Sequence, residues 1–177
     1  EDGATTVYAY DRNGRLERVQ YPGGGVEEYT YDAMGNRTAS GTVSYVANDL
    51  NQYTQVGGVQ FTYDADGNLT GDGSASYVYD AENRLTTLSA GGESWDYTYD
   101  ALNNRETVVQ GAETVRFLND PTSPVNVAAV YDGEGALVAH YVFGLQLVAR
   151  MGAGGERHFY GYDRLGNTRL VTDAAGA

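Results

Sequence analysis

The sequence predicts an all-β protein built from tandem antiparallel β-hairpins. Two patterns point to this class. The dipeptide Tyr-Asp recurs along the chain, and a Gly or Asn stands at a fixed distance after each Tyr. The composition agrees, with 16 Tyr and 24 Gly in 177 residues, because Tyr favours half-exposed strands and Gly favours tight turns.

Seven Tyr-Asp pairs mark the repeat: Tyr10-Asp11, Tyr31-Asp32, Tyr63-Asp64, Tyr79-Asp80, Tyr99-Asp100, Tyr131-Asp132 and Tyr162-Asp163. Several of the intervals are near 16 residues or twice 16. We therefore expect a further unit between Tyr31 and Tyr63. Ala47-Asn48 takes the place of Tyr-Asp in that unit, which restores 16-residue steps at positions 31, 47, 63 and 79.

The fourth residue after the Tyr position is always Gly or Asn. These eight residues are Gly14, Gly35, Asn51, Gly67, Asn83, Asn103, Gly135 and Gly166. Gly and Asn tolerate a positive φ best. The pattern predicts a hairpin loop built on a type I turn, with a left-handed residue and a G1 bulge. The Asp carboxylate is expected to accept a backbone N–H two residues on and so close the loop.

The residues that flank each turn predict the strands. An aromatic residue stands two before the Tyr in most units, which places both rings on one strand face; the pairs are Tyr8 and Tyr10, Tyr29 and Tyr31, Phe61 and Tyr63, Tyr77 and Tyr79, Tyr97 and Tyr99, and Tyr160 and Tyr162. A second strand follows the turn, as in Arg84 to Leu88, and Gly-rich reversals such as Gly57-Gly58 and Gly91-Gly92 connect the units. The prediction is a continuous antiparallel meander.

The array divides into three parts without a linker. Residues 1–110 are regular hairpins. Residues 111–157 are less regular, with a loop from Asn119 to Pro124, because two prolines cannot sit in a central ladder. Longer, more apolar strands are expected at Val125 to Val130 and Ala136 to Arg150. Residues 158–177 contain the last unit.

Charge and composition argue against several functions, among them nucleic-acid binding, thiolate metal binding and membrane spanning. The net charge is −13, and all basic residues are Arg; this field repels nucleic acid and anionic lipid. The sequence has no Cys and 2 His, so we expect no disulfide, no thiolate metal site and no cofactor. No apolar run is long enough to span a membrane, and any export signal would lie outside this segment.

Units such as Tyr31 to Arg37 (YDAMGNR) and Tyr63 to Leu69 (YDADGNL) resemble the YD repeat, also called the RHS repeat. The resemblance covers roughly residues 7–175. The tail from Phe159 to Asp173 resembles the start of the RHS-associated core of bacterial members.

The resemblance implies a curved, continuous β-ribbon that is part of a spiralling hollow shell. In bacterial RHS proteins and toxin complexes that shell encloses a C-terminal toxin domain, and in teneurins it belongs to a cell-surface adhesion receptor. The aspartates of family autoproteolysis lie in the core domain, beyond this segment. No catalytic residue is therefore carried over, and we expect a structural protein rather than an enzyme, secreted or at the cell surface.

The sequence supports a structural turn better than three specific sites: a calcium loop, a catalytic carboxylate pair and a nucleophilic triad. Asp64, Asp66 and Asn68, with Asp72 nearby, resemble the opening of a calcium loop, but Leu69 and Ala75 occupy the places that require Gly and Glu. Asp132 and Glu134 offer two carboxylates in a turn frame that other units share. His140 lacks the Gly-x-Ser-x-Gly elbow that would accompany a nucleophilic triad.

The Tyr rows admit two interpretations. Cross-strand packing of Tyr on Tyr is favoured over stacking on carbohydrate. Two functions remain open: the wall of a shell around a toxin or effector, and an extracellular adhesion or self-assembling filament protein. In both, the open sheet edges are expected to meet further YD repeats of a longer chain or other copies.

Overall fold

The computed structural model describes residues 5–123 and 127–177. Every regular element among them is a β-strand, and within each of two sheets the consecutive strands pair antiparallel. The all-β prediction is therefore confirmed. The described part of the chain contains no helix that could cross a membrane. Pro124 and Val125, at the end of the predicted loop and the start of the predicted strand, lie outside the described residues.

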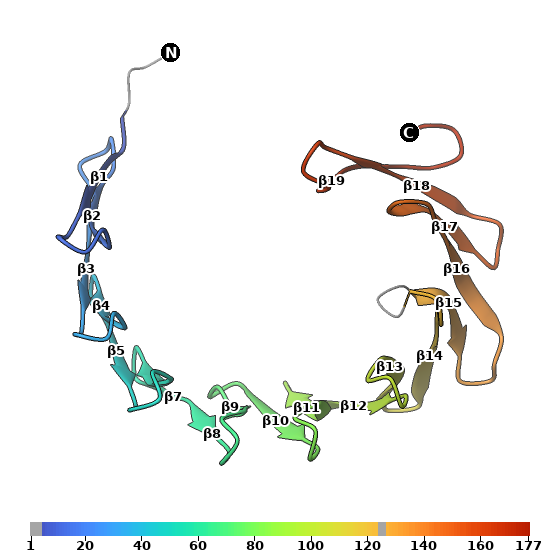
Figure 1. The fold of residues 1–177 in the computed structure, drawn as a ribbon, viewed down its shortest axis with the longest axis horizontal. Helices are drawn as coiled ribbons and strands as arrows, with labels where there is room; N and C mark the ends of the chain where they lie inside the picture. Colours follow the sequence, from blue (N-terminus) through green and yellow to red (C-terminus); the bar gives the residue numbers. More distant parts are fainter. Residues whose placement is uncertain (1–4, 124–126) are drawn as a thin grey trace. The chain divides into compact units, whose positions relative to one another are not determined.

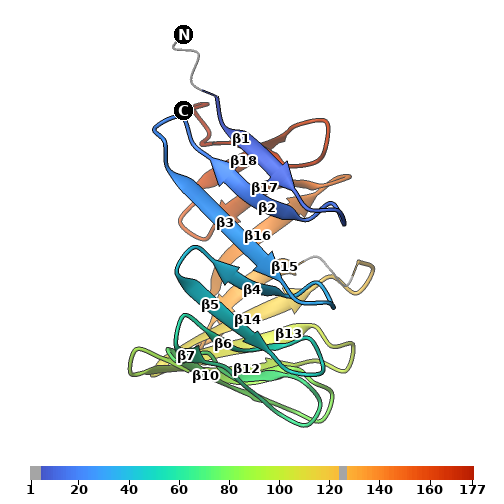
Figure 2. The ribbon, with the colours of Figure 1, turned by 90° about the vertical axis from the view of Figure 1, so that its left-hand side faces the viewer.

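The chain forms two compact units, residues 1–77 and 78–177. In the first unit, seven strands make one sheet in chain order, and a hairpin of two short strands follows (Figures 1 and 2). These nine strands are β1 Val7–Tyr10, β2 Leu16–Gln20, β3 Val26–Tyr31, β4 Arg37–Ser40, β5 Val43–Ala47, β6 Tyr53–Val56, β7 Val59–Gln60, β8 Thr62–Tyr63 and β9 Leu69–Gly71. Strand β10, Ala75–Tyr79, spans the boundary between the units.

The second unit continues the same plan, and each strand pairs with the next one in the chain. Its strands are β11 Leu85–Ala90, β12 Glu93–Tyr99, β13 Arg105–Gln110, β14 Glu113–Asn119, β15 Val127–Asp132, β16 Leu137–Phe143, β17 Leu147–Gly152, β18 Arg157–Tyr162 and β19 Thr168–Thr172. The strand predicted from Ala136 to Arg150 is instead two strands, β16 and most of β17, because the chain turns at Gly144.

Two kinds of turn alternate along the chain, so each unit has two unlike edges. We call one the Asp edge; its turns begin at Asp11, Asp32, Asn48 and Asp64 in the first unit and at Asp80, Asp100, Asp120, Gly144 and Asp163 in the second. We call the other the Gly edge; its turns begin at Tyr21, Gly41, Gly57 and Asp72 in the first unit and at Gly91, Gly111, Asp132, Gly152 and Asp173 in the second.

The Gly edge contains several two-residue hairpin loops. In Gly57-Gly58 and Gly91-Gly92 both residues have a positive φ, as a type I′ turn requires. That turn matches the right-handed twist of the strands it joins, and only glycine adopts it twice without steric cost. Glycine at these loops is therefore a backbone requirement.

The Tyr131-Asp132 turn lies on the Gly edge of the second unit, not on the Asp edge. In the predicted repeat of strand, tight turn, strand and loose turn, every Tyr-Asp turn would lie on the same side of the sheet. The structure places an Asp-edge turn at Asp120, between Tyr99 and Tyr131, and the next reversal, at Asp132, is therefore on the opposite side, where Asp132 pairs with Val115 in β14. This corrects the prediction that all eight aligned turns are equivalent in place.

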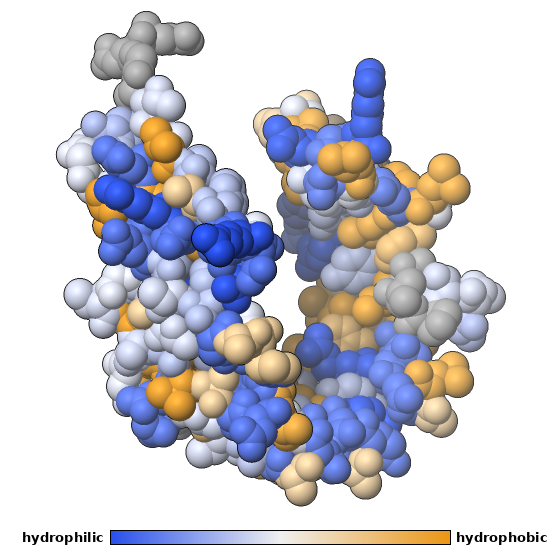
Figure 3. Space-filling model, turned by 60° about the vertical axis from the view of Figure 1, so that its left-hand side comes forward, coloured by the Kyte–Doolittle hydropathy of each residue, from blue (hydrophilic) through white to orange (hydrophobic). Residues whose placement is uncertain are grey.

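Each unit is a single layer of strands with almost no interior. Among the described residues, the buried side chains are Val19, Ala129, Ala139 and Ala149, and none is large. On the surface shown in Figure 3, hydrophobic and hydrophilic residues are interspersed. Exposure alternates along strands such as β12, where Trp95, Tyr97 and Tyr99 are half-buried and Asp96 and Thr98 are exposed. One sheet face is therefore aromatic and the other polar.

Candidate functional site

The Asp-edge turn is the feature that recurs most regularly. In the turn that starts at Asp64, the backbone N–H of Gly67 donates to the carbonyl of Asp64, and the N–H of Asp64 donates to the carbonyl of Asn68. The pairing register shifts between Thr62 and Tyr63, which marks a bulge. All eight aligned Gly and Asn residues have a positive φ, including the three asparagines Asn51, Asn83 and Asn103.

The Asp side chain closes each loop with two backbone bonds. Asp64 Oδ1 accepts the N–H of Asp66 at 3.0 Å and that of Asn68 at 2.8 Å. The same two bonds form at Asp11, Asp80, Asp100, Asp132 and Asp163, and Asp32 Oδ1 accepts the N–H of Asn36. Asp therefore acts here as the local acceptor that a turn needs.

In six of the seven Tyr-Asp turns, all except that at Asp132, the side chain four residues after the Asp donates a hydrogen bond to the second carboxylate oxygen. Asn36 Nδ2 donates to Asp32 Oδ2 at 2.9 Å, and Arg15 Nε donates to Asp11 Oδ2 at 2.7 Å. The amide of Asn36, together with turn N–H groups and against the opposing effect of desolvation, lowers the pKa of Asp32. The amide of Asn68 likewise lowers the pKa of Asp64.

The irregular repeat at Ala47-Asn48 keeps the two backbone bonds and reverses the direction of the side-chain bond. Asn48 Oδ1 accepts the N–H of Leu50 at 2.9 Å and of Gln52 at 3.0 Å, as an Asp would. Asn48 Nδ2 then donates to Gln52 Oε1 at 2.9 Å. The amide pair Asn48–Gln52 therefore replaces the usual carboxylate and its donor, which explains why the unit tolerates the loss of Asp.

The same partner side chains connect one turn to the next along the Asp edge of the first unit. Arg15 Nη1 donates to the carbonyl of Asp32 at 3.1 Å. Asn36 Nδ2 donates to Asn51 Oδ1 at 2.8 Å, and Gln52 Nε2 donates to the carbonyl of Gly67 at 2.9 Å. Four consecutive turns are thus joined in sequence by three bonds. In the second unit, Arg84 Nη1 reaches Asn103 Oδ1 in the same way, at 2.9 Å.

The Tyr of the Tyr-Asp pair joins neighbouring hairpins through its hydroxyl. Tyr31 Oη donates to the carbonyl of Leu16 at 2.7 Å, and Tyr99 Oη donates to the carbonyl of Leu85 at 2.8 Å. Tyr63 and Tyr162 do the same to Tyr53 and Leu147. Each acceptor is the first residue of the strand that follows the preceding Asp-edge turn. At Leu16, Tyr53 and Leu147 a bulge interrupts the regular ladder at this point.

Arginine, rather than a second Tyr, covers several of these rings. The guanidinium carbon of Arg15 lies 4.7 Å from the ring centre of Tyr31, and that of Arg84 lies 5.0 Å from Tyr99. Arg37 covers Tyr29 at 4.6 Å. A ring pair does form at Tyr45 and Tyr53, whose centres are 5.4 Å apart. The prediction of Tyr-on-Tyr packing is therefore wrong at Tyr29, Tyr31 and Tyr99, where the contact is cation–π.

Two turns of this type are not apparent from the Tyr-Asp pattern. Asp173 accepts the N–H groups of Ala175 and Ala177, and Gly176 has a φ of 83°, so residues 172–177 form a full turn with Thr172 in the Tyr place. At Asp120 the preceding residue is Asn119, whose Nδ2 donates to the carbonyl of Arg105 at 3.2 Å. Asn119 therefore makes the contact that a Tyr hydroxyl makes in other units.

The aspartates of the calcium-loop and paired-carboxylate hypotheses make hydrogen bonds within their own turns. Asp64 is occupied by the three donors from Asp66 and Asn68, and Asp72 accepts from Ser74, Ala75 and the hydroxyl of Tyr77. The hydroxyl of Tyr77, with the donors of Ser74, holds the pKa of Asp72 well below its usual range. Asp132 closes its own loop. In residues 5–123 and 127–177, no group of three or more His, Asp or Glu is arranged to hold a metal.

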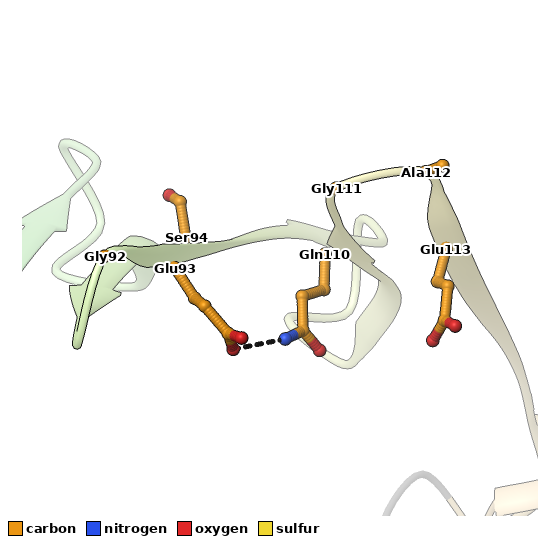
Figure 4. Close-up of a pocket in the computed structure, with 7 residues that line it drawn as sticks. All are labelled: Gly92, Glu93, Ser94, Gln110, Gly111, Ala112 and Glu113. Carbon is orange, nitrogen blue, oxygen red and sulfur yellow. Dashed lines mark hydrogen bonds between the residues drawn. The ribbon is translucent and has the colours of Figure 1, made fainter.

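The Gly edge of the second unit contains two neighbouring hollows. The first, of about 590 Å³, lies between the turns at Gly92 and Gly111, and the side chains of Glu93, Gln110 and Glu113 point to the same side of it (Figure 4). Gln110 Nε2 donates to Glu93 Oε2 at 2.7 Å. The second, of about 380 Å³, lies between Ala112 and Glu134, and its lining includes Val115, Val130 and Val138.

The turn chemistry and the single-layer ribbon agree with a comparison to known families. Residues 2–177 match the family model described as Teneurin YD-shell. The chain belongs to the teneurin YD-shell family. The resemblance to YD repeats is thereby confirmed, and the Tyr-Asp turns are the units of this YD-shell segment.

Solved structures similar to this YD-shell segment come from a toxin complex. The crystal structure of TcdB2-TccC3 is 15% identical, with a TM-score of 0.39, over 99% of this chain and 10% of that one. A structure of the Photorhabdus luminescens Tc holotoxin pore is 16% identical, with a TM-score of 0.38, over 98% of this chain and 9% of that one. The segment thus spans about a tenth of the chains it matches. No protein with a curated description matches it.

Proposed function

We propose that this YD-shell segment is part of the wall of a hollow β-shell that encloses a toxin or effector domain until delivery. The observation that carries the proposal is the single-layer ribbon, whose described residues bury four small or medium side chains. Such a ribbon has no interior of its own, so its half-buried aromatic face needs another surface or a closed space behind it. Membership of the YD-shell family supports the same role.

The hydrogen bonds of the Asp edge suit a wall. Backbone pairing joins the neighbouring hairpins of each sheet. Several hairpins are also joined by a Tyr hydroxyl and a partner side chain, as the Asp11 and Asp32 hairpins are by Tyr31 and Arg15. Stability in such an array is a sum of nearest-neighbour terms, so the ribbon can extend without a central core. The partners in this proposal are further YD repeats and the enclosed domain; the role needs no cofactor. We place the protein outside the cell or at its surface.

Limited proteolysis of the complete native protein tests the proposal. A domain enclosed by the shell should resist proteinase K until urea opens the repeats, so its digestion and the unfolding of the repeats should share one urea midpoint. The control is the same domain expressed alone, which should be digested at once. Rapid digestion of that domain within the native protein would contradict the proposal.

The second candidate is extracellular adhesion, which the relation to teneurins supports. It predicts binding of the purified chain to cells or glycans. The Arg-covered rings of Tyr29, Tyr31 and Tyr99 leave less ring face for sugar stacking. Binding that disappears when other exposed tyrosines, such as Tyr8 and Tyr10, are replaced would favour adhesion; protection of an enclosed domain would favour the shell.

A further inference from the structure

The tip of the first Asp-edge turn differs chemically from the other tips. The dipeptide Asn13-Gly14 is the only place in the 177 residues where Gly follows Asn. Asn13 is exposed, and its backbone N–H donates to Asp11 Oδ1 at 2.9 Å, but its side-chain amide makes no hydrogen bond within the described residues. An unrestrained amide and a following residue without a side chain therefore coincide at this tip.

The turn network restrains most other asparagines of the chain. Four places after the turn-opening Asp, the side-chain amide donates to the carboxylate; these residues are Asn36, Asn68, Asn104 and Asn167. At the left-handed place, Oδ1 of Asn51 and Oδ1 of Asn103 accept a hydrogen bond from the preceding turn. Each of these asparagines also precedes a residue that has a side chain. They are thus restrained in two ways that Asn13 is not.

An Asn-Gly pair allows an intramolecular reaction. The backbone nitrogen of Gly14 can attack Cγ of Asn13, because Gly has no Cβ to hinder the approach. The N–Cγ bond forms, the N–H proton passes to water, and the Cγ–Nδ2 bond breaks with release of ammonia, which takes its third hydrogen from water. The product is a five-membered succinimide ring, and the step uses no oxidant or reductant.

Water then opens the ring at one of its two carbonyl groups. Opening at Cγ leaves an ordinary aspartate at position 13. Opening at the main-chain carbonyl leaves an isoaspartate, in which the backbone runs through Cβ and Cγ and is one atom longer. The net change replaces an amide with a carboxylate, consumes one water molecule and releases one ammonia.

The attack requires one exposed hydrogen bond of the turn to open. In the closed turn the N–H of Gly14 donates to the carbonyl of Asp11 at 3.0 Å. Turn tips open at a low free energy, because few buried contacts oppose the opening. Apart from the chain neighbours of Gly14, no described heavy atom lies within 4 Å of the place where a Cβ of this residue would be. The tip therefore has room for the two groups to meet.

We infer that Asn13 is a site of spontaneous deamidation, and that its isoaspartate product weakens the link between the first two hairpins. An aspartate at this tip is compatible with the turn, since Asp66 occupies the same place after Asp64. The extra backbone atom of isoaspartate moves position 13 away from Arg15, so Asp11 Oδ1 cannot keep its bonds to both N–H groups. The inference does not depend on the proposed enclosure of a toxin.

Arg15 connects the modified turn to the next one. Its Nε donates to Asp11 Oδ2 at 2.7 Å, and its Nη1 donates to the carbonyl of Asp32 at 3.1 Å. Its guanidinium carbon also lies 4.7 Å from the ring centre of Tyr31. A distorted loop at Asp11 releases Arg15 from the first contact and so weakens the other two. The isoaspartate form should therefore be less stable than the aspartate form.

Peptide mapping by mass spectrometry of the folded chain, stored in mildly alkaline buffer, tests this inference. The peptide that contains Asn13 should gain about 1 Da and separate into an aspartate and an isoaspartate form. It should do so at least about tenfold faster than any peptide with another asparagine, because only Gly14 leaves the attack unhindered. The rate should rise with pH, since the attacking nitrogen must lose its proton.

Gly14→Asn is the matched variant. Asn51, Asn83 and Asn103 occupy the same place in other turns with a positive φ, so the variant keeps the turn and adds a side chain to the attacking residue. Modification of Asn13 should then slow about tenfold or more. Asn13→Asp should keep the urea midpoint of the fresh chain, whereas the isoaspartate form, separated by chromatography, should have a lower midpoint.

Three results would overturn the inference. Asn13 could stay unmodified in the folded chain while it reacts in the same chain unfolded in urea, which would mean that the closed turn blocks the attack. Asn13 could react no faster than the other asparagines, or no slower in Gly14→Asn, which would remove the role of Gly14. An isoaspartate form with an unchanged urea midpoint would show that the turn link to the second hairpin survives.

Discussion

The hydroxyl of Tyr31 donates a 2.7 Å hydrogen bond to the carbonyl oxygen of Leu16, fifteen residues earlier and in the neighbouring hairpin. Leu16 pairs with Tyr10 at a bulge, so the Tyr of one unit completes the irregular part of the unit before it. This relationship explains why Tyr, and not Phe, stands beside the Asp: the ring supports the face of the sheet, and the hydroxyl provides the link.

Replacing Tyr31 with Phe should remove this link and retain the ring. We expect a loss of about 1 kcal/mol in the free energy of unfolding, the usual value for one hydrogen bond. Urea denaturation followed by circular dichroism measures it. Tyr10→Phe is the control, because Tyr10 has the same place in its unit but is 60% exposed; it should change the midpoint little. Equal effects of the two substitutions would show that the hydroxyl link contributes nothing.

Gly67→Val should destabilise the array more than Asp64→Asn. Gly67 has a φ of 89°, and a Cβ there would meet Gln52 Nε2 at 3.1 Å, so Val adds backbone strain and disturbs the link from Gln52 to the next turn. We expect a loss of about 2 kcal/mol or more for Val, and less than about 1 kcal/mol for Asn, which keeps the acceptor oxygen. Urea midpoints compare the two. Equal losses would mean that the carboxylate charge itself stabilises the turn.

The reversed amide pair predicts a compensating double substitution. In Asn48→Asp, the carboxylate would face Gln52 Oε1, so Gln52 must turn its amide over and give up its 2.9 Å bond to the carbonyl of Gly67. We expect a loss of about 1 kcal/mol. Adding Gln52→Arg, the residue type found at Arg15 and Arg84, should restore stability. A double-mutant cycle measures the coupling, and independent effects of the two changes would contradict the pairing.

The turn aspartates predict a specific acid sensitivity. The pKa values of Asp32, Asp64, Asp100 and Asp163 are lowered, first by the side-chain amide four residues on and then by backbone N–H groups. A carboxyl whose folded pKa is lowered stabilises the fold above its unfolded pKa of about 3.9, and this stability is lost as pH falls through the folded pKa. Urea midpoints should therefore be flat from neutral pH to about pH 5 and fall below about pH 4.

The neutral turn at Asn48 provides the control for this pH dependence. Asp64→Asn should reduce the slope of stability against pH in the acid range, because it removes one titrating turn group. Asn48→Gln leaves the number of carboxylates unchanged and should shift stability without changing that slope. A slope that stays the same in Asp64→Asn would assign the acid sensitivity to other carboxylates.

The local structure follows from the sequence, because it depends on a few adjacent residues. A Gly or Asn four places after the Tyr requires a positive φ wherever it occurs, and Asp32 or Asp163 finds its acceptor role within its own loop. The Asn48 turn was recoverable for the same reason: Asn51 marks the left-handed position although Tyr and Asp are both missing.

The edge on which each turn lies could not be predicted from a few adjacent residues. Asp120 lacks a preceding Tyr and is followed by Pro121, and the turn at Asp132 has the same local bonds as the Asp-edge turns. Only a count of all intervening strands assigns it to the Gly edge. The Arg–Tyr contacts were missed because Arg15 and Tyr31 are sixteen positions apart, and their meeting depends on register.

The turn at Asp132 has a consequence for how such proteins change in length. The same kind of loop closes either side of the sheet. A protein of this kind can therefore still fold as a continuous ribbon when it gains or loses less than a whole Tyr-Asp unit. Insertion or deletion of one strand with its loop exchanges the sides of everything that follows and breaks no local rule. Length and sidedness can therefore vary independently in evolution, and homologues should differ by odd as well as even numbers of strands.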